Sequence, residues 1–258
     1  MIHIKNNILD TKLIREEYIS SLITHIPHSS LVIPNVDNYL ISEEELDKEN
    51  LKLSDVGTNT LFNLGPYVTS LVFQYSRLFC DVERLPDADE EMFKFGRGFF
   101  YTKTDDGRDL RTTELKETVQ NLYEEYHATF DFLVDSTLEA VGFATIIDCH
   151  SFSDKPFDTD LIKERDRPDI CIGTDDFHTP DWLKTRVVSQ FESLGYKVKI
   201  NNPYSGTIVP LKHYKKNKEV SSIMIEVNRK LFTNFAGTNI DYSKLLELNR
   251  VLKKIFYI

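Results

Sequence analysis

The sequence has few cysteines, a shortage of positive charge and no long apolar run. No apolar stretch approaches the roughly 20 residues that a membrane-spanning helix needs, and no N-terminal segment has the pattern of a signal peptide. The cysteines, Cys80, Cys149 and Cys171, are odd in number and widely spaced. This pattern argues against a disulfide framework and against a cysteine-based zinc knuckle. We therefore expect a cytoplasmic protein with unpaired cysteines and no membrane partner.

The shortage of positive charge bears on the choice of partner. Against 41 acidic residues the chain has 31 Lys and Arg, which gives a net charge of −10. Binding nucleic acid requires clustered Lys and Arg, so we expect no nucleic-acid partner. The lysine-rich run at residues 212–218 is the exception. We interpret it as a solvated loop, with an anion-attracting rim of a site as the alternative.

What the chain does contain is enough apolar material for one core. Hydrophobic residues make up 41% of its 258 positions, and we expect a single domain over residues 1–258. Several short runs are apolar throughout, as in strands covered on both faces. Their alternation with helical patterns predicts an α/β fold with a mixed, largely parallel sheet flanked by helices on both faces. The predicted strands are residues 21–26, 67–73, 78–80, 144–147, 170–173, 197–200 and 222–227, and the predicted helices are about 54–64, 110–140, 180–195 and 241–256.

Polar residues cluster directly after the predicted strands, where ligands bind in parallel sheets. Each cluster alone has an ordinary structural explanation, but their convergence at one edge predicts the site of a metal hydrolase. Catalytic zinc takes three protein ligands, usually His with a carboxylate, and activates a water. A separate carboxylate must accept the proton of that water, and arginines are suited to hold a substrate carboxylate. The clusters begin at His28, Asp81, Asp148, Asn201 and Glu226.

Five of these motifs, taken together and in order, resemble the N-formylglutamate amidohydrolase family, a distant relative of zinc carboxypeptidases and aspartoacylase. The resemblance runs from about residue 22 to 232. It implies a zinc-peptidase-like α/β fold, one zinc ion, and hydrolysis of the amide of a small N-acyl amino acid, such as N-formyl-L-glutamate to formate and glutamate. The motifs are Pro27-His28-Ser29, Asp81-x-Glu83-Arg84, Asp148-Cys149-His150-Ser151, Asn202-Pro203-Tyr204-Ser205-Gly206 and Glu226-Val227-Asn228-Arg229.

The resemblance implies a set of zinc ligands. His28 and His150 match the two histidines of the family. The carboxypeptidase group has a Glu three residues after its first His, but this chain has Leu31 there. Asp55 resembles the family's Asp ahead of its first helix, so we expect Asp55 to be the middle ligand, with Asp81 as the second choice. The native metal remains open among zinc, cobalt, iron and manganese.

The resemblance also implies roles around the metal. Glu226 would be the general base, and Arg84 and Arg229 would hold the two carboxylates of the substrate. Tyr204 and Asn202 would orient the substrate or its carbonyl. His127 and His213 would be further substrate contacts, with helix packing as the alternative for His127.

Other residues near these motifs receive structural or uncertain roles. Asp148 would either face away from the metal or hold His150 by a hydrogen bond. Cys149 would pack as a small apolar side chain. His25 would point to the opposite face from His28 and serve the structure. Glu83 replaces an Asn that is common in the family, and Thr207 replaces a Gly. These two departures put the identity of the substrate in doubt more than the reaction.

Three other functions stay open from the residues. The protein could be a zinc deacylase or peptidase acting on another small substrate. It could be a metal-free binding protein on the same scaffold, since the expected Glu is missing at position 31. It could also be a cysteine hydrolase that uses Cys149. The oligomeric state is not predicted.

Overall fold

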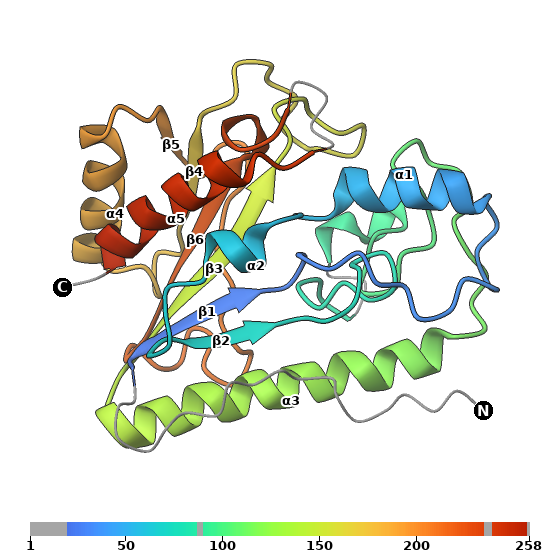
Figure 1. The fold of residues 1–258 in the computed structure, drawn as a ribbon. Helices are drawn as coiled ribbons and strands as arrows, with labels where there is room; N and C mark the ends of the chain where they lie inside the picture. The colour runs from blue at the N-terminus through green and yellow to red at the C-terminus, as the bar shows by residue number, and fades with distance from the viewer. Residues whose placement is uncertain (1–19, 87–89, 235–238, 257–258) are drawn as a thin grey trace.

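A six-stranded sheet forms the centre of the fold, as a computed structural model that describes residues 20–86, 90–234 and 239–256 shows (Figure 1). The strand order is β2-β1-β3-β6-β4-β5. Four neighbouring strands are parallel, and β4 pairs antiparallel with β6, which reverses β4 and β5 relative to the rest. The predicted mixed, largely parallel sheet is thereby confirmed. The strands are β1 (Leu22–Ile26), β2 (Thr69–Val72), β3 (Ala144–Phe152), β4 (Ile170–Gly173), β5 (Val198–Ile200) and β6 (Val220–Asn228).

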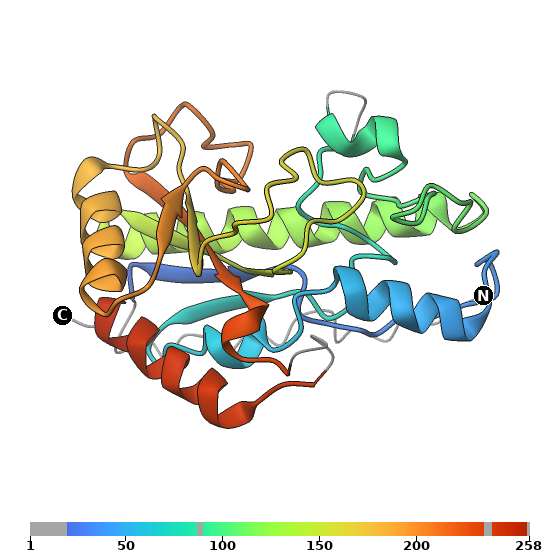
Figure 2. The same ribbon diagram turned by 90° about the horizontal axis from the view of Figure 1, so that it is seen from above.

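Helices cover both faces of the sheet (Figures 1 and 2). The long helix α3 (Lys116–Val141) covers one face, and α2 (Thr58–Leu61), α4 (Asp181–Ser193) and α5 (Tyr242–Phe256) cover the other. Because side chains alternate along a strand, Ile146 packs in the α3 layer while Ile147 packs in the α4–α5 layer. All nine residues of β3 are buried for this reason, which explains why Ile146 and Ile147 are both apolar although they point to opposite faces.

Helix α1 (Glu43–Leu53) was not predicted. The Ser42 hydroxyl accepts a hydrogen bond from the backbone N–H of Glu45, and the Glu45 carboxylate accepts one from the backbone N–H of Ser42, which is a capping box. The helix buries Leu46 and Leu53 and lies beyond the carboxyl ends of the parallel strands (Figure 1). The acid-rich stretch before Asp55 is therefore an ordered element beside the strand ends.

Two predicted boundaries were wrong. Residues 78–80 form a turn, because the N–H groups of Phe79 and Cys80 both donate to the carbonyl of Ser76. The long helix starts at Lys116 rather than near 110, since Leu110 is tied by its N–H to the carbonyl of Thr102. Two short 3-10 helices, Glu91–Phe95 and Arg229–Leu231, complete the described elements.

The structure bears on the predictions about the cysteines and about membrane-spanning helices. Cys80, Cys149 and Cys171 are all buried and unpaired. Of the helices in the described part of the chain, none combines the length and the apolar character needed to cross a bilayer.

Candidate active site

The carboxyl ends of β1, β3 and β6 bring the predicted polar residues together on the face that α3 covers. Strand register places His150 directly beside Glu226 and places Asp148 beside His25. Residues paired in this way point to the same face of a sheet. The same face is apolar near the start of β3, at Ile146, and polar near its end.

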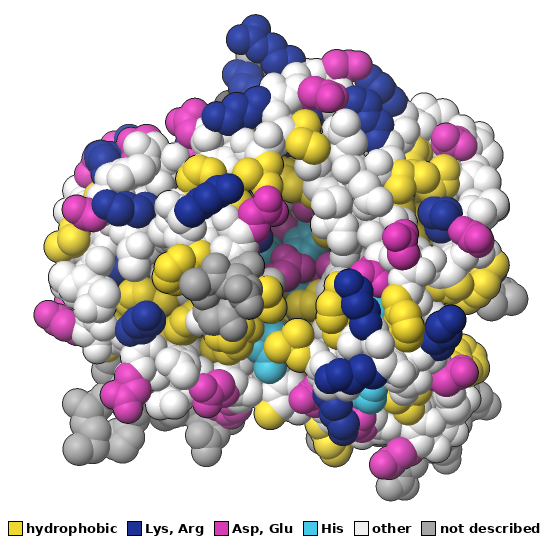
Figure 3. Space-filling model, turned by 180° about the vertical axis from the view of Figure 1, so that it is seen from behind, with side chains coloured by type: hydrophobic (Ala, Val, Ile, Leu, Met, Phe, Trp, Pro, Cys, Tyr) yellow, Lys and Arg dark blue, Asp and Glu magenta, His cyan; other side chains and the backbone are white. Residues whose placement is uncertain are grey.

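A cavity of about 480 Å³ opens over these side chains, within the size range of sites for small organic ligands. Figure 3 shows acidic and histidine side chains at the bottom of the hollow, with hydrophobic side chains around it. Its charged and histidine lining residues are His28, His127 and His150, the carboxylates Asp55, Glu83, Glu91, Asp148, Asp160 and Glu226, and the arginines Arg77, Arg84 and Arg97.

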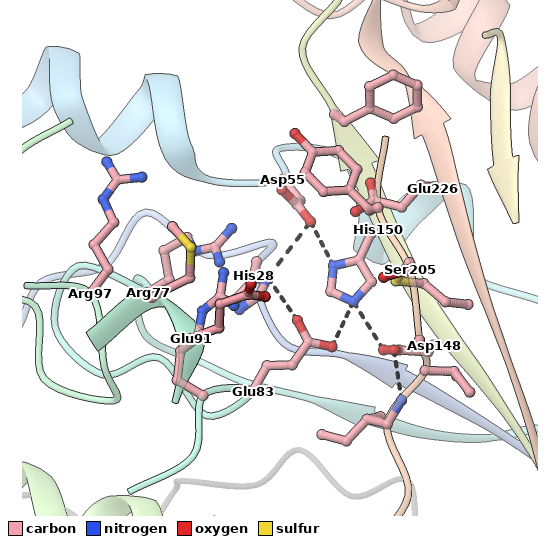
Figure 4. A pocket seen from close by; sticks show the side chains of 18 of the residues that line it. His28, Asp55, Arg77, Glu83, Glu91, Arg97, Asp148, His150, Ser205 and Glu226 are labelled. Atoms are coloured by element: carbon pink, nitrogen blue, oxygen red, sulfur yellow. Dashed lines mark hydrogen bonds and ion pairs between the residues drawn. The ribbon is translucent and has the colours of Figure 1, made fainter. Parts of the chain in front are cut away.

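His28 and His150 lie side by side with their ring centroids 5.2 Å apart (Figure 4). Each has a carboxylate at its Nε2 atom. The Nε2 of His28 is 2.8 Å from Asp81 Oδ1, and that of His150 is 2.9 Å from Asp148 Oδ1. The Nδ1 atom of His28 is buried and has no hydrogen-bond partner among the described residues.

Asp55 faces both Nδ1 atoms. Its Oδ2 lies 3.0 Å from Nδ1 of His150 and 3.8 Å from Nδ1 of His28. The backbone N–H of Asp55 donates to the carbonyl of His28 over 2.8 Å, which fixes the aspartate next to the first histidine. Burial would raise the pKa of Asp55, but the hydrogen bond to His150 and the proximity of His28 lower it below its ordinary value. The structure thus brings together the three residues predicted to hold a metal.

Glu83 reaches the same two histidines and was not predicted to do so. Its Oε1 lies 2.9 Å from Nε2 of His150, and its Oε2 lies 3.7 Å from Nδ1 of His28. Ligand atoms of His28, Glu83 and His150 all fall within 4.8 Å of one another, as do those of His25, Glu83 and Asp148. No local signal was available, because residues 81–84 form a turn in which the N–H of Glu83 donates to Asp81 Oδ1.

The two carboxylates differ in how firmly they are placed. The side chain of Asp55 is 5% exposed and is held by the backbone N–H of Ser151 as well as by His150. The side chain of Glu83 is longer and 21% exposed. Asp55 is therefore the better placed partner for the two Nδ1 atoms.

Asp81 has its oxygens fully engaged away from the Nδ1 atoms. Oδ1 faces His28 Nε2, and Oδ2 accepts from Arg77 Nη2 at 2.9 Å and from the Tyr101 hydroxyl at 2.7 Å. Burial would raise the pKa of Asp81, but the charge of Arg77 holds it well below its ordinary value. The structure places this second-choice ligand as the residue that orients His28.

Glu226 faces the cavity beside His150. Its residue is 8% exposed, and its Oε2 atom has no hydrogen-bond partner among the described residues. Burial raises the pKa of Glu226 to about 8, against the lowering effect of His150. For His150, burial lowers the pKa, but the charges of Glu83 and Asp148 raise it well above its ordinary value.

Three of the predicted substrate residues line the cavity. Arg84 donates from Nη1 to Glu90 over 3.4 Å, and its Nε lies 3.7 Å from Asp81 Oδ2. The Tyr204 hydroxyl donates to Asp160 over 3.2 Å. His127 has its Nε2 atom 2.8 Å from the carbonyl of Val82, and burial lowers its pKa to about 4.

The other three predicted substrate residues lie outside the cavity lining. The guanidinium of Arg229 donates to the carbonyls of Ser54 and Lys52, just beyond and at the end of α1. His213 has its Nε2 atom 2.9 Å from Asp135 of α3. Asn202 lies outside the lining, although the next residue, Pro203, is part of it.

Asp148, Cys149 and the lysine-rich run at residues 212–218 each had alternative roles in the sequence analysis. Asp148 holds His150 and also lies 2.9 Å from Nδ1 of His25, whose ring stacks on Phe130. Cys149 is fully buried among the apolar side chains of the opposite face, where burial raises the pKa of its thiol well above the ordinary value. A thiol in that place cannot reach the cavity as a nucleophile. The lysines of residues 212–218 are exposed and lie outside the cavity lining, as in a solvated loop.

Buried histidines and carboxylates at the carboxyl ends of parallel strands define a class, the α/β proteins with an enzyme-type site at that edge. Within this class the chain belongs to the N-formylglutamate amidohydrolase family, whose sequence profile matches residues 20–233. It is therefore a member of a hydrolase family.

Two solved structures share the fold. The N-formylglutamate amidohydrolase of Ralstonia eutropha JMP134 is 20% identical, with a TM-score of 0.79 over 94% of this chain and 93% of that one. A gene product of Agrobacterium tumefaciens is 16% identical, with a TM-score of 0.62 over 91% and 88% of the two chains. No protein of curated function matches the sequence.

Proposed function

We propose that the protein is a metal-dependent amidohydrolase that removes the formyl group from an N-formyl amino acid, with N-formyl-L-glutamate yielding formate and glutamate as the reaction to test first. The observation that carries this proposal is that the Nδ1 atoms of His28 and His150 both face the carboxylate of Asp55, with the buried carboxyl of Glu226 beside His150. The Nδ1 atom of His28 is buried and has no hydrogen-bond partner among the described residues. Membership of the family supports the same reaction class.

The chain's residues fit a zinc ion. A buried polar atom without a partner calls for an explanation, and Nδ1 of His28 faces Asp55 at 3.8 Å. Two histidine nitrogens and a carboxylate are a common ligand set for catalytic zinc. Asp81 and Asp148, behind the Nε2 atoms, are the outer carboxylates that orient metal-binding histidines. His28, Asp55 and His150 would hold the ion, which when bound supplies a Lewis acid for the amide carbonyl and lowers the pKa of water.

Glu226 performs the proton transfers in this proposal. It accepts the proton of the attacking water and delivers it to the amine that leaves. Its Oε2 has no partner to compete for that proton, and burial keeps its pKa far above that of an exposed glutamate. A general base works best when its pKa lies near the operating pH.

The remaining lining residues bind and orient the substrate. Arg84 has no hydrogen-bond partner at its Nε among the described residues and would hold one substrate carboxylate. Tyr204 is braced by Arg167, whose Nη1 donates to its hydroxyl over 3.2 Å, so its ring would form a fixed wall. His127 is neutral at pH 7, because burial lowers its pKa to about 4, and would contribute shape and polarity rather than charge.

The test combines metal analysis with kinetics on the purified protein. We expect about one zinc per chain and release of formate from N-formyl-L-glutamate. Glu226→Gln should keep its zinc and lose about three orders of magnitude in kcat, in line with the loss of a general base. Absence of zinc after loading would favour a metal-free binding protein. Zinc without deformylation would favour a deacylase or peptidase acting on another small substrate.

A further inference from the structure

Glu83 is the one carboxylate near the histidine pair to which the proposed mechanism gives no task. Four others have one, because Asp55 would bind the metal, Asp81 and Asp148 orient the two histidines, and Glu226 is the base. The exposed fractions of Asp55, Asp81, Asp148 and Glu226 are 5%, 0%, 1% and 8%, whereas the side chain of Glu83 is 21% exposed. Glu83 is therefore the carboxylate of this group that meets a ligand entering the cavity.

The cavity offers little positive charge to balance a substrate with two carboxylates. Of its described lining residues, the arginines are Arg77, Arg84 and Arg97, and no lysine is among them. Arg77 donates to Asp81 through Nε and Nη2 and to the carbonyl of Leu53 through Nη1. That guanidinium is already committed to the support of His28.

Arg97 is also committed. Its Nη1 donates to the hydroxyl of Thr159, and its Nη2 lies 3.3 Å from Asp105 and 3.7 Å from Glu49. Two carboxylates thus neutralise this guanidinium. Arg84 lies 3.4 Å from Glu90 through Nη1 and 3.7 Å from Asp81 through Nε, and Arg77 already neutralises that aspartate. The side chain of Arg84 is 29% exposed, against 5% for Arg97, so Arg84 remains as the arginine that can take a substrate carboxylate.

N-formyl-L-glutamate has two carboxylates, and Arg229, which was expected to hold the second, lies outside the cavity lining. The second carboxylate would then share the cavity with Glu83 and no free arginine among the described residues. Like charges brought together in a desolvated site repel each other, and such repulsion is a common source of specificity. Resting on the proposed function, we propose that Glu83 determines specificity by favouring N-formyl amino acids with a single carboxylate and a neutral polar side chain over dicarboxylates.

The test uses two substrates of nearly the same shape, N-formyl-L-glutamine and N-formyl-L-glutamate. For the zinc-loaded protein we expect kcat/KM to be about tenfold or more higher for the glutamine compound, the effect of a modest like-charge penalty. Glu83→Gln removes the charge and keeps the shape. It should bring the ratio close to one, mainly by lowering KM for the glutamate compound. Glu117→Gln, on the exposed surface of α3, removes one charge outside the cavity lining and should leave the ratio as it is.

Zinc content of each variant and binding of the free products complete the design. Equal kcat/KM for the two substrates in the parent protein, or an unchanged ratio in Glu83→Gln, would overturn the proposal. Loss of zinc from Glu83→Gln would also overturn it, by making Glu83 a metal ligand. If neither substrate is hydrolysed, the proposed function fails separately. Calorimetric titration with L-glutamine and L-glutamate then tests the role of Glu83 by itself. Selection by charge requires that the parent protein binds L-glutamine more tightly than L-glutamate, and that Glu83→Gln binds the two with similar affinity.

Discussion

Glu226 illustrates how a functional residue can reduce stability. Burial raises its pKa to about 8 in the folded chain, from an ordinary value of 4.5. A carboxyl whose pKa is raised on folding stabilises the folded state as long as it is protonated. This contribution to the free energy of unfolding is complete below pH 4.5 and is lost as the pH rises through 8. We expect the metal-free protein to melt several degrees lower at pH 9 than at pH 7. Glu226→Gln should reduce this difference, as followed by circular dichroism.

The raised pKa of His150 acts in the same direction, so the difference should shrink rather than vanish. His127 acts in the opposite sense below pH 6.5, since its lowered pKa favours folding only while the ring is neutral. Measurements between pH 7 and 9 therefore isolate the first two groups. An identical pH profile for Glu226→Gln would show that this carboxyl is not protonated in the folded protein.

Asp81 gives a second prediction at the residue scale. Asp81→Asn keeps the volume but removes the charge that faces His28, Arg77 and Tyr101. Loss of an outer carboxylate of this kind typically weakens metal binding by about 10–100-fold. Chelator competition with zinc measures the change. Asp109→Asn, at an exposed ion pair with Lys103, is the matched control and should bind zinc as the parent does.

At the scale of elements, Arg229 should stabilise α1 rather than bind substrate. Its guanidinium is buried and donates to the carbonyls of Lys52 and Ser54, next to Asp55. Hydrogen bonds that involve a charged donor are worth about 1.5–3 kcal/mol, so Arg229→Ala should lower the free energy of unfolding by about that amount. Urea unfolding measures it. A selective rise in KM for N-formyl-L-glutamate over N-formyl-L-glutamine would instead restore Arg229 as a carboxylate clamp.

The same residue shows what could be predicted from the sequence and what could not. The convergence of His28, His150 and Glu226 on one cavity could be predicted, because each lies at or near the carboxyl end of a parallel strand and such ends meet. The position of Arg229 outside the cavity lining could not be predicted, because its partner, α1, was not recognised. The capping box from Ser42 to Glu45 was the local signal for that helix.

Strand direction could not be predicted either. The run at residues 170–173 gives no indication of whether its strand is parallel, since short buried runs look alike in either direction. The sequence therefore did not show that β4 is the strand that pairs antiparallel with β6. Contacts between distant segments, such as His150 with Glu83, depend on loop paths that no local pattern encodes.

For the whole molecule, a bound ion should couple function to stability. The metal-free site gathers several buried carboxylates around two histidines in a chain whose net charge is already −10. A ligand at 100 times its dissociation constant stabilises the folded state by about 2.7 kcal/mol. For a chain of this size that corresponds to a rise in melting temperature of about 5–10 °C. Removing zinc with a chelator should lower the melting temperature by this amount, and adding zinc back should restore it.

His28→Asn should abolish this response to zinc. Mg²⁺ prefers oxygen ligands and should not raise the melting temperature of the parent protein. An equal response to zinc in the parent protein and His28→Asn would mean that the ion binds elsewhere.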